Sequence, residues 1–325
     1  MPVAKIKQKV LLKELQITMN LTYVCNKPRI IRPTIVSIQP KGDYENSPMK
    51  ESCVLSDKEE IMSERLSDYE MIAELGRGSY AIVKEWINKL IEKRVAIKEY
   101  EKKNLVTPQK RITVSNEIKT LSLLKHPNIV RLYTTIEDND KLYLVMEVIK
   151  GQSLEKYIQA KCRLQEAEAI SLFKQILEAI AYCHEQQICH RDIKTENILI
   201  TPEGNVKLID FGFATLSSRN ERLKVFCGTP CYMSPEIVSR KKYLGPNADI
   251  WSLGILYYFM LSGSFPFHGK SLQDLFRNIY RGKYACPACI SPLAKNFINR
   301  MLQVNEEKRA TAKDVISTLI IVVKR

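Results

Sequence analysis

Apolar and polar positions divide the chain into two regions with different patterns. Strand-like runs of β-branched and aromatic residues occupy 69–75, 82–87, 95–98, 129–136 and 141–147. A helix is expected at about 107–124, between these runs, because Thr107 is a suitable N-cap and Pro108 a suitable first-turn residue. The sequence therefore predicts a strand-rich first region that contains one helix.

The pattern becomes helical after residue 151. Leu172, Ile176 and Ile180 recur every four residues, which predicts the apolar stripe of a long helix. The segment 250–260 is apolar on nearly all sides, as expected for a helix at the centre of a lobe.

Residues 1–66 differ from both regions and are expected to form a largely disordered extension. Prolines interrupt this segment, and 52–64 is mostly polar and charged. The alternative is a short extended segment around the apolar residues 30–38 that docks on another surface. Because the chain ends soon after its last expected helix, we expect any regulation in cis to come from residues 1–66.

The composition of the chain indicates its cellular compartment and the kinds of partner it binds. The formal charge of +14 favours binding to polyanions, but no nucleic-acid-binding motif accompanies this charge, so no nucleic-acid partner is expected. The nine cysteines form neither a disulfide framework nor a convincing zinc site; they indicate structural thiols in a reducing compartment, the cytoplasm or the nucleus. The apolar run at 10–12 is too short for a membrane span. No feature of the sequence indicates an oligomeric state.

The stretch from His190 to Asn197, followed by Asp210, carries the strongest chemical signal. Phosphoryl transfer requires positioning, Mg²⁺ and cations more than covalent chemistry. Asp192 would accept or orient the proton of an attacking hydroxyl, and Lys194 would contact the γ-phosphate. Asn197 and Asp210 offer the hard oxygen ligands that Mg²⁺ prefers. Each residue alone could simply cap a turn, but the set in this order predicts catalysis.

The glycine-containing segment 76–81 joins the first two expected strands. Small residues there allow backbone N–H groups to approach phosphates closely. The next expected strand ends in Lys98, whose side chain would enter the cleft in which these phosphates bind. Glu117 on the expected helix can reach back to Lys98; its alternative is a solvated carboxylate beside Lys119.

These motifs, together with Asp210-Phe211-Gly212 and Ser234-Pro235-Glu236, resemble a complete eukaryotic protein kinase domain. The resemblance covers Tyr69 to about Val323. It implies an α+β two-lobed protein kinase fold with a small antiparallel β N-lobe containing one major helix, and a larger α-helical C-lobe. The N-lobe would span 67–147, and the hinge and C-lobe 148–325.

The same resemblance implies ATP and Mg²⁺ as cofactors, held in the cleft between the lobes. The residues expected to contact the nucleotide are Leu75, Gly76, Arg77, Gly78, Ser79, Tyr80, Ala81, Val83, Ala96, Lys98, Glu117, Met146, Glu147, Val148, Leu199 and Asp210. Among these, Met146 would be the gatekeeper, and the backbone at Glu147 and Val148 would bind adenine. Asp192, Lys194 and Asn197 would be catalytic, with Asn197 and Asp210 as metal ligands. A Glu236–Arg309 ion pair and an Asp249 tether to the catalytic loop are also implied.

Lys194 and the segment Gly228-Thr229-Pro230 are similar to serine/threonine kinases, which implies protein substrates bearing Ser or Thr. Phe226-Cys227-Gly228 and Tyr243-x-Gly245-Pro246 resemble the calcium/calmodulin-dependent group, in particular its AMP-activated and microtubule-affinity-regulating branch. Polo-like and NIMA-like kinases share parts of this pattern. A pseudokinase scaffold and a small-molecule phosphotransferase are the competing functions.

Several positions depart from the family pattern. Val225 stands where many relatives carry an activating threonine, so we expect the loop either to be ordered by packing of Val225 or to be controlled through Ser217 or Ser218. Ser153, Cys231 and Phe259 replace acidic residues that bind substrate arginine, although Glu196 is kept, which predicts a weaker preference for basic substrates. Ala81 replaces a glycine, a mild change that should preserve activity.

Overall fold

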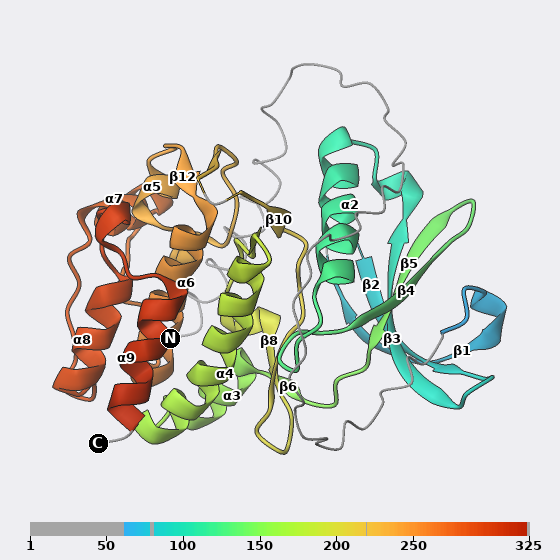
Figure 1. Cartoon of the computed structure of the whole chain (residues 1–325), viewed down its shortest axis with the longest axis horizontal. Helices are drawn as coiled ribbons and strands as arrows, with labels where there is room; N and C mark the ends of the chain where they lie inside the picture. Colours follow the sequence, from blue (N-terminus) through green and yellow to red (C-terminus); the bar gives the residue numbers. More distant parts are fainter. Residues whose placement is uncertain (1–61, 79–80, 219, 324–325) are drawn as a thin grey trace, which may run out of the picture. The chain divides into compact units, whose positions relative to one another are not determined.

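A computed structural model describes residues 62–78, 81–218 and 220–323. Its first lobe is a five-stranded antiparallel sheet flanked by helix α2 (Figure 1). The strand order is β1-β2-β3-β5-β4, with bounds β1 (Tyr69–Arg77), β2 (Ala81–Asn88), β3 (Lys93–Glu101), β4 (Leu132–Glu137) and β5 (Lys141–Glu147). The predicted strand-rich region is thus confirmed.

Helix α2 (Pro108–Leu123) begins where the sequence predicts. The Thr107 hydroxyl accepts a hydrogen bond from the Lys110 N–H at 3.4 Å, and Pro108 takes the first helical position, where no N–H is needed. The buried face of α2 contains a carboxylate, Glu117, beside Val114 and Leu121. A buried charge on this face requires a partner, which the neighbouring strand supplies.

Strand β4 begins later than predicted. The pattern placed its start at residue 129, but β4 starts at Leu132. Ile129 instead forms an isolated parallel bridge with Leu208, in which the Val130 N–H donates to the Leu208 carbonyl at 2.8 Å and the Leu208 N–H donates to the Asn128 carbonyl at 2.8 Å. The apolar run predicted the burial correctly, but the pairing partner is distant in sequence.

The packed N-lobe also reaches further toward the N-terminus than residue 67. Met62 is buried in a cluster with Tyr69, and the Tyr69 hydroxyl donates to the Ser63 carbonyl at 2.7 Å. The rest of the expected extension, and with it the alternative docking segment at 30–38, lies outside the described residues.

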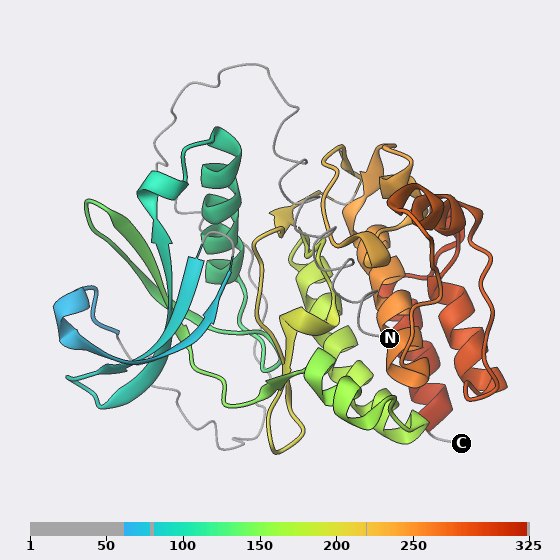
Figure 2. The ribbon, with the colours of Figure 1, turned by 180° about the vertical axis from the view of Figure 1, so that it is seen from behind.

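The second lobe is mainly helical (Figure 2). Its helices are α3 (Leu154–Lys161), α4 (Glu166–Glu185), α5 (Pro235–Val238), α6 (Gly245–Ser262), α7 (Leu272–Arg281), α8 (Pro292–Met301) and α9 (Ala312–Val323). Short strands are β6 (Gln152–Ser153), β7 (Ile188–Cys189), β8 (Ile198–Ile200), β9 (Val206–Leu208), β10 (Thr215–Leu216), β11 (Arg222–Leu223) and β12 (Tyr243–Leu244). The 3₁₀ helices of both lobes are η1 (Leu66–Asp68), η2 (Lys102–Asn104), η3 (Thr195–Asn197), η4 (Pro230–Tyr232) and η5 (Glu306–Lys308).

Helix α6 lies at the centre of this lobe, as its apolar sequence predicts. Trp251, Leu253 and Ile255 are completely buried, and the Trp251 ring stacks on Phe267 at 5.7 Å. None of the helices in the described ranges is both long enough and apolar enough to span a membrane.

Candidate active site

The catalytic loop is fixed by a buried carboxylate from helix α6. Asp249 accepts hydrogen bonds from the backbone N–H groups of His190 at 2.9 Å and Arg191 at 2.7 Å. Arg191 has a φ of 64°, a left-handed conformation that non-glycine residues rarely adopt. The two hydrogen bonds stabilise that backbone, and they confirm the expected tether.

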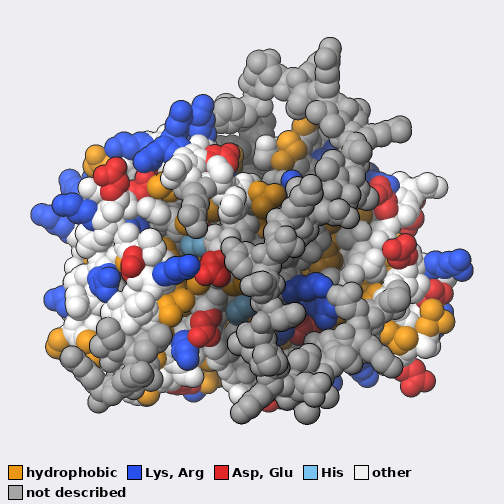
Figure 3. All heavy atoms as spheres, viewed as in Figure 1, with side chains coloured by type: hydrophobic (Ala, Val, Ile, Leu, Met, Phe, Trp, Pro, Cys, Tyr) orange, Lys and Arg blue, Asp and Glu red, His pale blue; other side chains and the backbone are white. Residues whose placement is uncertain are grey.

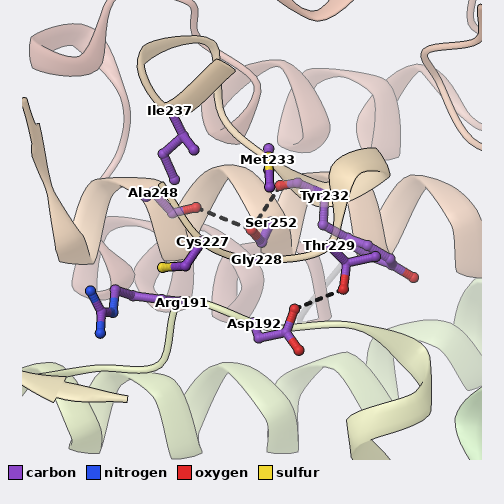
Figure 4. A pocket seen from close by; sticks show the side chains of 10 residues that line it. All are labelled: Arg191, Asp192, Cys227, Gly228, Thr229, Tyr232, Met233, Ile237, Ala248 and Ser252. Atoms are coloured by element: carbon purple, nitrogen blue, oxygen red, sulfur yellow. Dashed lines mark hydrogen bonds between the residues drawn. The ribbon is translucent and has the colours of Figure 1, made fainter. Parts of the chain in front are cut away.

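Asp192 lies in this loop with both carboxylate oxygens bound by donors. Oδ1 accepts from the Thr229 hydroxyl at 2.8 Å (Figure 4). Oδ2 accepts from Lys194 Nζ at 2.7 Å and from Asn197 Nδ2 at 3.2 Å. Asp192 is almost entirely buried. The structure therefore brings the three expected catalytic residues, Asp192, Lys194 and Asn197, together.

Lys194 remains charged in this setting. Burial alone would lower the pKa of the Lys194 ammonium, but the Asp192 carboxylate more than offsets that effect, and the pKa ends above its usual value. Lys194 Nζ also donates to the Thr229 hydroxyl at 3.1 Å. A fixed cation thus lies beside the carboxylate, as stabilisation of a transferring phosphoryl group requires.

Strand β3, helix α2 and the Asp210 loop converge on Lys98. Its Nζ lies 2.6 Å from Glu117 Oε1 and 3.4 Å from Asp210 Oδ1. These distances confirm the predicted Lys98–Glu117 ion pair. The positive charge of Lys98 is the main reason that the pKa of Asp210 falls to about 2, so this carboxylate is ionised at neutral pH.

Two oxygens remain for a cation near Asp210. Asn197 uses its Nδ2 amide to bond Asp192, and Asp210 uses Oδ1 to accept from Lys98 and the Gly212 N–H. Within the described residues, no hydrogen bond engages Asn197 Oδ1 or Asp210 Oδ2. One carboxylate and one amide oxygen suit Mg²⁺, which usually binds few protein ligands together with nucleotide phosphates.

Phe211 and Gly212 hold Asp210 in place. The Phe211 side chain is completely buried and packs on the His190 ring at 4.8 Å. A Cβ at position 212 would lie 3.2 Å from Asp210 Oδ1, closer than most such contacts. Glycine at 212 therefore leaves the carboxylate in its observed orientation.

The residues expected to enclose a nucleotide lie on neighbouring strands. Val83 is opposite Lys98 in the β2–β3 register, and Ala96 is opposite Met146 in the β3–β5 register. The other described members are on or beside β1 (Leu75, Gly76, Arg77, Gly78), at the start of β2 (Ala81), at and after the end of β5 (Glu147, Val148) and on β8 (Leu199). Ser79 and Tyr80 lie outside the described residues.

Two details refine these expectations. A Cβ added at Gly76 would meet no described atom within 4 Å, so the space around this glycine is open to a ligand. The Glu147 N–H donates to the Arg131 carbonyl at 2.9 Å, and the Glu147 side chain pairs with Lys207. The Glu147 N–H is therefore not available to adenine.

The segment around Val225 corrects one hypothesis. Its side chain is 47% exposed, so packing of Val225 does not order the loop. The segment is held through its backbone instead: the Tyr243 hydroxyl donates to the Val225 carbonyl at 2.9 Å, and Leu223 pairs with Tyr243 between β11 and β12. Ser217 is buried and Ser218 is exposed, so Ser218 is the accessible hydroxyl of that pair.

Ser153, Cys231 and Phe259 have local structural roles. The Ser153 hydroxyl caps α3 by accepting from the Lys156 N–H at 3.2 Å. Phe259 packs on Phe265 with ring centroids 4.7 Å apart, and Cys231 is half-buried. None of the three supplies a carboxylate. The weaker preference for basic substrates therefore stays a prediction.

An ion pair anchors the end of the substrate-side segment to the C-lobe. Arg309 Nη1 lies 2.7 Å from Glu236 Oε1, and the Arg309 side chain is fully buried. A second bond joins Arg309 Nη2 to Glu236 Oε2 at 3.0 Å. The expected pair is confirmed, with bidentate geometry.

Two further residues, not predicted from the sequence, contribute to this site. Thr229 bonds both Asp192 and Lys194, although its motif was noted only for its similarity to serine/threonine kinases. Tyr100 bonds Glu117, and nothing in its spacing from Lys98 except the strand period of two could have indicated it.

Comparison with known proteins agrees with this geometry. Residues 69–320 match the family described as "Protein kinase domain". The chain is 41% identical over 253 residues to the rice proteins "Serine/threonine protein kinase OSK3" and "Serine/threonine protein kinase OSK4", from Oryza sativa subsp. indica and subsp. japonica. Each match covers 78% of this chain and 50% of the relative, so the chain spans about half the length of these relatives.

Proposed function

This chain belongs to the protein kinase family, and on that premise we propose that it is an ATP-dependent kinase that phosphorylates Ser or Thr hydroxyls of protein substrates. The observation that carries the proposal is the intact pair of clusters around Asp192 and Lys98. Each cluster pairs a buried carboxylate, Asp192 or Glu117, with a lysine, and each contains side chains that phosphoryl transfer requires.

The role of each side chain follows from its contacts. Asp192 accepts the proton of the substrate hydroxyl, and its donors Thr229 and Lys194 hold its carboxylate in one orientation. Lys98 is held by Glu117 where it contacts the nucleotide phosphates. Asn197 and Asp210 hold Mg²⁺, which when bound supplies positive charge to the phosphates.

The two competing functions are less well supported. A pseudokinase scaffold would lack one of Lys98, Asp192 or Asp210, and all three are present. A small-molecule phosphotransferase would not need the segment that Glu236 and Arg309 anchor, which in protein kinases forms the platform for a peptide substrate. We place the chain within the calcium/calmodulin-dependent group, near its AMP-activated branch, on the motifs Phe226-Cys227-Gly228 and Tyr243-x-Gly245-Pro246.

One assay tests the proposed activity. The protein is incubated with labelled ATP, Mg²⁺ and a generic protein substrate, beside the variant Asp210→Ala. Phosphoserine or phosphothreonine formed by the parent but not by the variant is the expected result, because Asp210 supplies a metal ligand. Absence of both products from the parent would refute the proposal.

Substrate preference is expected to depart from that of basophilic kinases. Besides the missing carboxylates at Ser153, Cys231 and Phe259, Lys and Arg side chains gather over the face that carries α5, α7 and β12 (Figure 3). Arg240 and Lys241, in the connection between α5 and β12, are exposed. Each lost carboxylate removes a charge-assisted hydrogen bond worth roughly 1–3 kcal/mol, so upstream arginine should raise kcat/KM less than it does in basophilic kinases, although Glu196 is kept. A peptide library in which arginine three residues before the acceptor is required would contradict this.

A further inference from the structure

Tyr100 lies two residues after Lys98 on strand β3, so both side chains leave the same face of the sheet, toward α2. The Tyr100 hydroxyl donates to Glu117 Oε2 at 2.5 Å, while Lys98 Nζ binds Oε1 at 2.6 Å. Lys98 Nζ also lies 5.4 Å from the centroid of the Tyr100 ring. Each oxygen of the Glu117 carboxylate therefore has its own donor from the same strand.

We propose that Tyr100 is a positioning residue for nucleotide binding: its hydroxyl fixes the Glu117 carboxylate, and with it helix α2, so that Lys98 is held where it meets the phosphates. The proposal rests on the kinase function proposed above and extends it to a residue outside the expected set. Tyr100 acts through Glu117 and touches neither nucleotide nor substrate.

The burial of the cluster makes the hydroxyl important. Glu117 and Tyr100 are 1% and 5% exposed, so no bulk water replaces a lost donor. An unsatisfied oxygen on a buried carboxylate is costly, and Glu117 would relieve this cost by turning or by moving with α2. Either movement would pull its other oxygen away from Lys98.

The hydroxyl is also chemically suited to the task. Burial raises the pKa of Tyr100 well above its usual value, so it remains a neutral donor over the whole working pH range. A neutral donor binds Oε2 without adding a second positive charge beside Lys98. The negative charge of Glu117 is thus balanced by Lys98 alone.

The sequence of the loop at Val225 gives a reason for a contact that positions helix α2 from within the N-lobe. In protein kinases, activation-loop phosphorylation commonly controls whether the lysine–glutamate pair forms. Val225 cannot carry a phosphate, and its side chain is exposed rather than packed. Tyr100 supplies a hold on α2 from within the N-lobe sheet, independent of that loop.

The test compares Tyr100→Phe with Tyr143→Phe. Tyr143 is equally buried on the adjacent strand β5, but its hydroxyl bonds Asp138, in the turn between β4 and β5. The dissociation constant for Mg-ATP is measured by calorimetry, with thermal unfolding as a check on folding. Tyr100→Phe should weaken ATP binding about tenfold and leave the KM for a peptide substrate unchanged, while Tyr143→Phe should bind ATP like the parent.

A merely structural role for Tyr100 would lower the melting temperature of Tyr100→Phe without changing its ATP affinity, and that result would overturn the proposal. A double-mutant cycle adds a second readout. In the Glu117→Gln background, Tyr100→Phe should cause much less than its effect in the parent, because the contact is already altered. Fully additive losses would show that Tyr100 does not act through Glu117.

The two proposals can fail separately. If the parent binds ATP but phosphorylates no protein, the kinase function fails, and the calorimetric comparison still decides the role of Tyr100. If the parent is active and Tyr100→Phe binds ATP with parental affinity, only the inference about Tyr100 fails.

Discussion

Replacing Asp192 by asparagine should lower kcat by about 100- to 10 000-fold, the usual contribution of a general base in a positioned site. Asparagine preserves the shape of the side chain and can still accept from Lys194 or Thr229, but it cannot take the proton of the substrate hydroxyl. Because Asp192 does not contact Lys98 or Glu117, the KM for ATP should change little. Steady-state kinetics with varied ATP and fixed peptide measures both quantities.

The matched control is Asp274→Asn, which alters an exposed carboxylate paired with Arg277 on α7. It should leave kcat unchanged, since an exposed pair of this kind contributes little. Parental turnover by Asp192→Asn would mean that another group accepts the proton, and the proposed role of Asp192 would be withdrawn.

Of the substitutions proposed, Arg309→Ala should lower the free energy of unfolding the most. Arg309→Ala leaves the Glu236 carboxylate, itself only 8% exposed, without its bidentate partner. Breaking a buried pair in this way costs roughly 3–5 kcal/mol, and the melting temperature should fall by about 10 °C. The substitution also removes the guanidinium that lies 5.3 Å from the Trp251 ring centroid and donates to the Asn247 carbonyl.

Thermal unfolding of Arg309→Ala beside Arg277→Ala tests this expectation. Arg277 forms an exposed pair one helical turn from Asp274, so its removal should shift the melting temperature by a degree or two at most, on the order of 0–1 kcal/mol. Equal shifts for the two variants would show that burial of the Glu236–Arg309 pair is not what stabilises the C-lobe.

The secondary structure could be predicted from the sequence where it depends on residues that are close together in the chain. Thr107 and Pro108 place the start of α2 because capping depends only on the first turn. The apolar α6 sequence predicts its central position. The predicted start of β4 was wrong because Ile129 pairs with Leu208, and no local pattern specifies a partner so distant in the chain.

In the candidate site too, some features follow from residues that are close in sequence and others depend on contacts between distant segments. Asp192, Lys194, Asn197 and Asp210 could be found from the sequence because their chemistry requires these residue types at short, fixed spacings. Val225 was a candidate for ordering the loop and Ser217 for controlling it, but the β11–β12 pairing and the Tyr243 hydroxyl hold the backbone around Val225, and Ser217 is buried beside the β7–β10 pair, where its N–H bonds the Gln187 carbonyl. Exposure is a property of the assembled lobe, and a side chain's type does not set it.

By itself, the sequence determined the chemistry: the acidic, basic and amide groups of phosphoryl transfer, the order in which they occur, and the family to which that order points. Only the tertiary structure decided how these groups are held. Thr229 reaches Asp192, and Tyr100 reaches Glu117, because separate segments pack side by side and bury a carboxylate that then requires each donor. Such contacts depend on the distance between segments in space, which sequence spacing does not contain.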